Sequence, residues 1–182
     1  MTIITNKSKL FRINIIWSII LVLIIIVSLS GFLYLTRDTN PIPTEIRNKL
    51  TFSPFIIPTS TKEYTTSNYT FDAIEDNTKT LHYLVNVSDN NIYISEYIQP
   101  PEFTEIPEYK DRFLSNVIES YATIQTSNGT IHLGRGKLNN NKQFGIMIEK
   151  SLLVWMYPEK EMNDTDWRQL GDQFEIRKIS NK

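Results

Sequence analysis

Leu81–Val87 (LHYLVNV) and Asn91–Gln99 (NIYISEYIQ) decide the fold, because both stretches are rich in the β-branched and aromatic residues that favour strands. Between them stands Ser88-Asp89-Asn90, and Asn and Asp tolerate the left-handed backbone of a tight turn. The pattern therefore predicts a β-hairpin. Tyr69–Glu75 (YTFDAIE) is expected to pair with the other side of its first strand.

Two further hairpins are predicted downstream. Tyr121–Thr126 and Thr130–Gly134 flank a Ser-Asn-Gly turn, and Phe144–Ile148 and Ser151–Tyr157 flank a turn at Glu149-Lys150.

Upstream of the first hairpin the sequence signals for strands are weaker. Phe52–Pro58 (FSPFIIP) is apolar, but its two prolines restrict it to an edge strand or an extended lead-in. The Thr- and Ser-rich stretch Thr59–Asn68 is predicted to be a loop.

Two segments have the periodicity of helices instead. In Glu108–Ser120 the apolar residues fall on one stripe, and charged residues lie off it. Near the C-terminus, Asn163 and Asp166 form a capping-box pattern, and the apolar residues that follow fall on one face. Thr44–Leu50 could add one helical turn. This order of elements predicts an α+β domain, a mainly antiparallel sheet with the two helices packed on one face.

Ahead of the sheet, Ile15–Leu35 is a run of 21 residues without a charge. At about 1.5 Å per residue it is long enough to span a bilayer core of about 30 Å. Lys7, Lys9 and Arg12 precede it, and this excess of cations predicts a cytoplasmic N-terminus. We therefore expect a single-pass protein of the cell membrane, with a cytoplasmic tail (1–12), a transmembrane helix (13–35), a linker (36–48) and an extracytoplasmic domain (49–180). The alternative is a signal peptide cleaved after Ser30.

Composition excludes several classes of function. Beyond the basic tail, acidic residues outnumber basic ones, so no basic surface is expected for nucleic acid. The absence of cysteine excludes disulfides, thiolate metal sites and cysteine nucleophiles. His82 and His132 have no metal-ligand spacing, and no phosphate-binding or nucleophile motif occurs. We expect no cofactor, no metal and no catalytic residue.

One feature indicates a binding surface. In the predicted strands the residues that alternate with the core positions are also apolar, and many of them are aromatic. This second set comprises Leu84, Tyr93, Tyr97, Met147, Leu153, Trp155 and Tyr157. A sheet face exposed to water would carry polar residues there, so this face is either covered by other elements or forms a hollow. Tyr93, Tyr97, Trp155 and Tyr157 are the candidate contact residues for a ligand or partner.

The stretch from Lys49 to Ile176 resembles the exported domain of uncharacterised single-pass bacterial membrane proteins found among anti-sigma-factor-like proteins. Three features carry the resemblance: the apolar-proline segment Phe52–Pro58, the hairpin end Tyr97–Pro101, and the strand Leu152–Tyr157 followed by a short amphipathic helix. It departs in lacking the Gly-Tyr pair that usually follows the proline segment. The resemblance implies a relative of the lipoprotein-carrier half-barrel, a curved antiparallel sheet with helices in its hollow.

Three functions are compatible with these observations. The first is a non-catalytic, membrane-anchored interaction domain with a protein or cell-envelope partner. The second is a carrier or sensor of a lipid-like or peptide ligand on the aromatic sheet face. The third is an enzyme with an unrecognised carboxylate site, and nothing in the sequence pairs two carboxylates for that chemistry.

Overall fold

The computed structural model describes residues 25, 27, 40–58, 61, 63–73, 79–137 and 142–179. This part of the chain is an α+β domain, as predicted. Its elements are α2 (Thr44–Arg47), β1 (Phe55–Ile56), β2 (Tyr64–Ala73), β3 (Lys79–Val87), β4 (Asn90–Ile98), α3 (Glu102–Glu105), α4 (Tyr109–Val117), β5 (Ile118–Thr126), β6 (Gly129–Gly136), β7 (Gln143–Glu149), β8 (Leu152–Pro158), α5 (Asp164–Gln173) and β9 (Glu175–Ile176).

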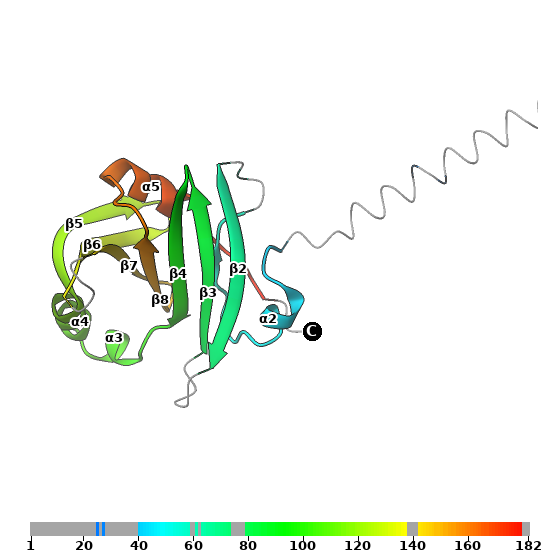
Figure 1. Ribbon diagram of the computed structural model, residues 1–182. Helices are drawn as coiled ribbons and strands as arrows, with labels where there is room; N and C mark the ends of the chain where they lie inside the picture. The colour runs from blue at the N-terminus through cyan, green and yellow to red at the C-terminus, as the bar shows by residue number, and fades with distance from the viewer. Residues whose placement is uncertain are drawn as a thin grey trace, which may run out of the picture. The chain divides into compact units, whose positions relative to one another are not determined.

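The main sheet has seven strands in the order β2-β3-β4-β8-β7-β6-β5, and neighbouring strands are antiparallel. It curves strongly, so that β2–β4 and β5–β7 face different directions (Figure 1). The predicted hairpin is confirmed: β3 and β4 pair from Leu81↔Glu96 to Val87↔Asn90. Its turn is two residues, Ser88 and Asp89, both with positive φ, as a tight hairpin turn requires.

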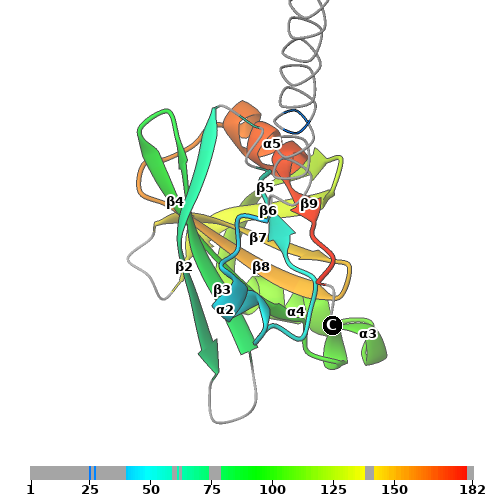
Figure 2. The ribbon, with the colours of Figure 1, turned by 90° about the vertical axis from the view of Figure 1, so that its right-hand side faces the viewer.

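A second, two-stranded sheet joins segments from the two ends of the described domain. β1 pairs with β9, with Phe55 opposite Ile176 and Ile56 opposite Glu175. Beyond the pair, the Arg177 backbone N–H donates to Pro54 O at 2.9 Å. Figure 2 shows β1 and β9 side by side in front of the main sheet. Of the two alternatives predicted for Phe52–Pro58, an edge strand or an extended lead-in, the structure contains the short strand.

We call the face of the main sheet that is covered by α5, β1 and β9 the inner face, and the opposite face the outer face. The inner face holds the larger core, with Phe55, Trp167 and Phe174 almost completely buried. The outer face holds a smaller core around Leu114, Phe144 and Leu153. Both faces are therefore apolar, as the sequence predicts.

The helices lie on opposite faces of the sheet, so the prediction that they share one face is wrong. α5 contributes Trp167 and Leu170 to the inner core, whereas α4 contributes Leu114 to the outer core. The order of elements does not encode the face, because a connection can leave a strand toward either side. The predicted N-cap of α5 is confirmed, since Asn163 and Asp166 form a capping box.

Two smaller predictions fail for local reasons. Met147 lies on the inner face rather than with Tyr97 and Trp155, since it stands opposite Val154 in the pairing of β7 with β8. The turn is Lys150-Ser151 rather than the predicted Glu149-Lys150, but this shift keeps Met147 on the same face, because residues directly opposite each other in an antiparallel pair share a face. Thr59–Asn68 is not all loop either, since β2 begins at Tyr64. β2 lies at the sheet edge with mostly exposed side chains, so it has little of the apolar alternation that identifies strands.

The described domain begins at Asn40, and residues from there onward form one compact unit. Ile42 and Leu50 already belong to the inner core. The predicted transmembrane span, 13–35, lies outside the described residues apart from Ile25 and Val27. Within the residues that are described, no helix has the length and apolar character needed to cross a membrane.

Candidate functional site

A row of stacked aromatic rings lies on the outer face, where β7 and β8 pair. Trp155 and Tyr157 are two residues apart on β8, so they point to the same side, and their rings are nearly parallel at an interplanar angle of 4°. Phe144 on β7 adds a third ring, with its centroid 5.3 Å from Tyr157 and 5.8 Å from Trp155. Such offset stacking fixes the orientation of each ring.

One end of this row is covered by helices. Phe113 of α4 presents an edge contact to Trp155, with ring centroids 5.8 Å apart, and Phe103 of α3 packs on Phe113. Beneath them, the Trp155 indole N–H donates to Tyr97 Oη at 3.1 Å. Burial raises the pKa of Tyr97, so its hydroxyl stays neutral and available as the acceptor. Tyr97 and Trp155 therefore belong to the outer core.

The other end of the row is open. A pocket of about 360 Å³ lies there, and it is lined by Tyr93, Lys142, Gln143, Phe144, Tyr157, Pro158 and Glu159. Tyr93 is 52% exposed, and it stands directly opposite Tyr157 in the pairing of β4 with β8. Apolar rings with charged groups at the edge are the usual composition of a ligand pocket, and the volume is within the usual range of about 300–1,000 Å³.

The polar edge of this pocket is held by hydrogen bonds. Glu159 accepts from Tyr93 Oη at 2.9 Å and from Asn91 Nδ2 at 3.0 Å. The bond to Glu159 raises the pKa of Tyr93, because ionising the phenol would place two negative charges side by side. Gln143 is fixed differently, since its amide exchanges two hydrogen bonds with the backbone of Met162. The pocket is therefore formed before any ligand arrives.

The four contact residues predicted from the sequence thus divide into two pairs. All four lie on the outer face, but Tyr93 and Tyr157 line the open pocket, whereas Tyr97 and Trp155 are packed under α3 and α4. Sequence reasoning missed Phe144, Lys142 and Glu159 as pocket residues. The strand register, which sequence does not supply, brings Phe144 next to Tyr157, whereas the position of Glu159 two residues after Tyr157 was an available signal.

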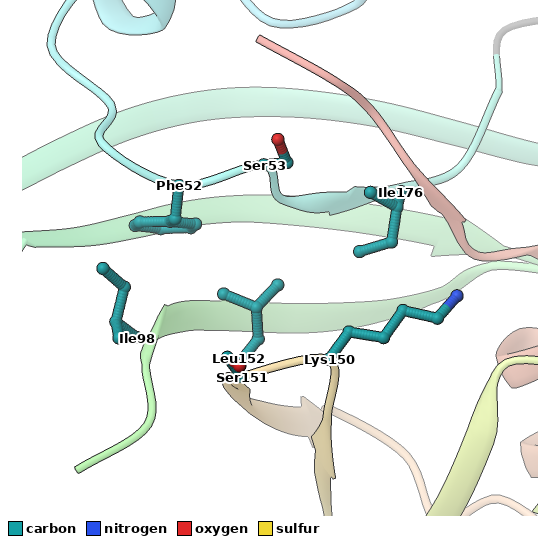
Figure 3. Close-up of a pocket in the computed structure, with 7 residues that line it drawn as sticks. All are labelled: Phe52, Ser53, Ile98, Lys150, Ser151, Leu152 and Ile176. Carbon is teal, nitrogen blue, oxygen red and sulfur yellow. The ribbon is translucent and has the colours of Figure 1, made fainter. Parts of the chain in front are cut away.

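A second hollow, of about 230 Å³, lies where the end of β4 meets the start of β8. Figure 3 shows Phe52 and Ile176 on one side of it and Ile98 and Leu152 on the other. The remaining lining residues are Ser53, Lys150 and Ser151. Ile98 is 50% exposed, although its strand position points toward the inner face. This hollow is almost wholly apolar, with the amine of Lys150 at its edge.

Glu96 is a carboxyl group buried in the inner core, and the sequence analysis did not single it out. It is 0% exposed, its Oε2 accepts from the Phe55 N–H at 2.9 Å, and its Oε1 lies 2.6 Å from Tyr83 Oη. Burial raises its pKa to about 8, although both hydrogen bonds act in the opposite direction. Its place two residues after Ile94 on β4 was the available signal, because alternation puts both on one face.

The two histidines make local contacts. His82 Nδ1 lies 2.8 Å from Ser95 Oγ, and its Nε2 lies 3.3 Å from Asp72 Oδ2. Burial, followed by the nearby Lys110, lowers the pKa of His132, so this imidazole favours its neutral form. Among the described residues, no group of three or more His, Cys, Asp or Glu side chains is placed to hold a metal ion.

Comparison with known proteins adds no relative from which a function could be transferred. No family model, no curated protein and no solved structure matches the chain. The function has to be inferred from the two hollows, the aromatic row and the buried carboxyl.

Proposed function

We propose that this protein is a non-catalytic, membrane-anchored binding domain whose contact site is the open end of the aromatic row. The anchor is the uncharged run Ile15–Leu35, which holds the domain on the extracytoplasmic side of the cell membrane. The observation that carries the proposal is the pocket of about 360 Å³ lined by Tyr93, Phe144 and Tyr157.

A protein partner fits this pocket best. Tyrosine and other aromatic residues are enriched where proteins bind one another, since they bury a large area and lose little side-chain entropy. Lys142 and Glu159 offer one charge of each sign at the edge, which suits a peptide backbone or a polar side chain beside an inserted apolar residue. We infer that the partner inserts one apolar or aromatic side chain against Tyr157 and Phe144.

Site-directed photo-crosslinking tests this proposal in intact membranes. A benzoylphenylalanine at position 93 replaces a tyrosine that lines the pocket, and one at position 106 replaces an isoleucine that is 36% exposed between α3 and α4 and does not line it. The proposal expects a discrete cross-linked partner from position 93 only. It also expects that product to be lost when Tyr157→Ala is added.

Two outcomes would contradict the proposal. One is equal cross-linking to the same products from both positions, which would indicate contact without a site. The other is a product from position 93 that survives Tyr157→Ala unchanged. A well-folded Tyr157→Ala chain, judged by its unfolding midpoint, is needed for the second comparison, and Tyr157 is only half-buried.

A carrier or sensor of a lipid-like ligand is the second candidate, and the apolar hollow in Figure 3 favours it. An engineered apolar cavity of about 150 Å³ binds benzene, so about 230 Å³ accommodates a short aliphatic segment. Mass spectrometry of the gently extracted protein would detect a bound lipid. Under this reading, Leu152→Gln, which makes the hollow polar, would abolish that signal, and Tyr157→Ala would leave it intact.

A further inference from the structure

Glu96 holds β1 against the main sheet through a closed ring of three contacts. The Phe55 N–H donates to Glu96 Oε2, Glu96 Oε1 lies against Tyr83 Oη, and Tyr83 Oη lies 3.0 Å from Phe55 O. The carboxyl and the phenol together therefore satisfy both backbone groups of Phe55, as a neighbouring strand would.

Counting hydrogens in this ring fixes the protonation state. Three contacts need three hydrogens, and the Phe55 N–H and the single hydroxyl of Tyr83 provide only two. The tyrosine hydroxyl lies within bonding distance of both Phe55 O and Glu96 Oε1, yet it can donate to one of them only. The third hydrogen has to come from the carboxyl group of Glu96, so the ring is complete only when Glu96 is protonated.

Loss of that proton would break the ring. Tyr83 would turn its hydrogen to the carboxylate, which leaves the buried carbonyl of Phe55 without its donor, a loss that costs free energy. The negative charge would also sit in the inner core. Burial raises the pKa of Tyr83 well above its ordinary value, so the phenol is not a competing source of a proton.

On the main sheet, the described neighbours of the ring are uncharged. Tyr69 of β2 stacks on Tyr83, with ring centroids 5.3 Å apart, and Leu81 and Val154 are the strand partners of Glu96. Lys150, an exposed residue in the β7–β8 turn, lies over the ring of Phe55 at 5.6 Å. Arg177 follows β9 beside Pro54, and its backbone N–H donates to Pro54 O.

We propose that Glu96 is a proton-operated clasp, which fastens the segment Phe52–Pro58 to the sheet when protonated and releases it when ionised. The segment connects the predicted membrane anchor to the main sheet in sequence. It also supplies Phe52 and Ser53 to the apolar hollow of Figure 3, so its release removes one wall of that hollow.

The direction of the pH dependence follows from linkage. In the released state the carboxyl reaches water and recovers its ordinary pKa of 4.5, whereas in the fastened state its pKa is about 8. The fastened state is fully favoured below the lower value, weakens as pH rises between the two, and changes no further above the higher one. Within this window the released fraction should rise about tenfold per pH unit.

Hydrogen exchange of the full-length chain in lipid nanodiscs tests the clasp. Protection of peptides covering 52–58, corrected for the intrinsic pH dependence of exchange, should fall about tenfold per pH unit between about pH 5 and 8. In Glu96→Gln the amide N–H donates to Tyr83 Oη in place of the carboxyl proton, so protection should stay high and flat. Glu119→Gln, which removes an exposed carboxylate on β5, should keep the wild-type slope.

Two results would overturn the clasp. One is a flat wild-type profile, and the other is an identical slope in wild type and Glu96→Gln. If the Glu96→Gln variant fails to fold, infrared spectroscopy of the wild-type chain tests the protonation of Glu96 directly. A protonated-carboxyl band present near pH 6 and lost near pH 9.5 supports the clasp. The absence of such a band near pH 6 rejects it.

Discussion

The two faces of the main sheet are both built from apolar residues, yet the inner face is covered by other elements and the outer face is covered only in part. The inner face lies under α5 and the β1–β9 pair, and its largest side chains, Trp167, Phe55 and Phe174, are sealed from water. The outer face is covered by α3 and α4 only at the Trp155 end, and its Tyr93 end is open. An apolar sheet face can therefore be a closed core at one end and an open pocket at the other, along the same two strands.

Tryptophan substitution on the inner face should have the largest effect on stability. Trp167 is 0% exposed, and a Cβ built on Gly145 would lie only 2.9 Å from its ring, so the ring has no free space beside it. We expect Trp167→Ala to lower the free energy of unfolding by about 3–5 kcal/mol, because it creates a large cavity. Urea unfolding of the full chain in nanodiscs measures this loss.

A loss below about 1 kcal/mol for Trp167→Ala would contradict a tightly sealed inner core. The indole N–H of Trp167 has no hydrogen-bond partner among the described residues, so its removal gives up packing and no hydrogen bond. The size of the effect therefore reports the cavity alone.

Replacing a tryptophan by alanine on the outer face should lower the free energy of unfolding by less. Trp155 is only half-buried, and its ring contacts Phe113, Phe144 and Tyr157. Trp155→Ala is expected to lower the free energy of unfolding by about 1–2 kcal/mol, since part of the ring is already in water and its neighbours can collapse toward the gap. The measurement is urea unfolding under the same conditions. A loss of unfolding free energy equal to that of Trp167→Ala would show that the outer core is sealed as tightly as the inner core.

At the open end, substitution should leave stability almost unchanged. Tyr93 is half-exposed, and its hydroxyl donates to the exposed Glu159. Tyr93→Ala should change the free energy of unfolding by no more than about 0.5 kcal/mol, while a contact residue of this type should weaken partner binding at least tenfold, or about 1.4 kcal/mol. Titration of the identified partner measures binding. Unchanged affinity would exclude Tyr93 from the contact surface.

Strand pairing was predictable where two signals coincide. The β3–β4 hairpin combines strand-forming residues with a turn that accepts left-handed backbone, and the N-cap of α5 combines Asn163 with Asp166. The part of β2 from Tyr69 onward was predicted to pair with β3 and does so, whereas the part before it lacked the first signal, because its edge position leaves polar residues exposed. α3 was not predicted, since four residues are too few to show a helical period.

The candidate site was predictable only in part. Period-two alternation groups Tyr93 with Tyr97 and Trp155 with Tyr157, and the pairing of β4 with β8, which sequence does not supply, brings both groups to one face. Which of them are covered depends on where α3 and α4 pack, and this information lies in contacts between distant segments. Glu96 shows the same limit, because its partners on β3 and β1 are set by the three-dimensional arrangement.

The pairing of β1 with β9 has a consequence for the time course of synthesis. Phe55 is translated some 120 residues before Ile176, its strand partner, so β1 has its contacts with Tyr83 and Glu96 but no strand partner until the chain is almost finished. Contacts of such wide sequence separation form late, because a long loop has to close first. A ribosome that stops short of Phe174 would therefore release a polypeptide whose opening strand stays unpaired and exposed to proteases.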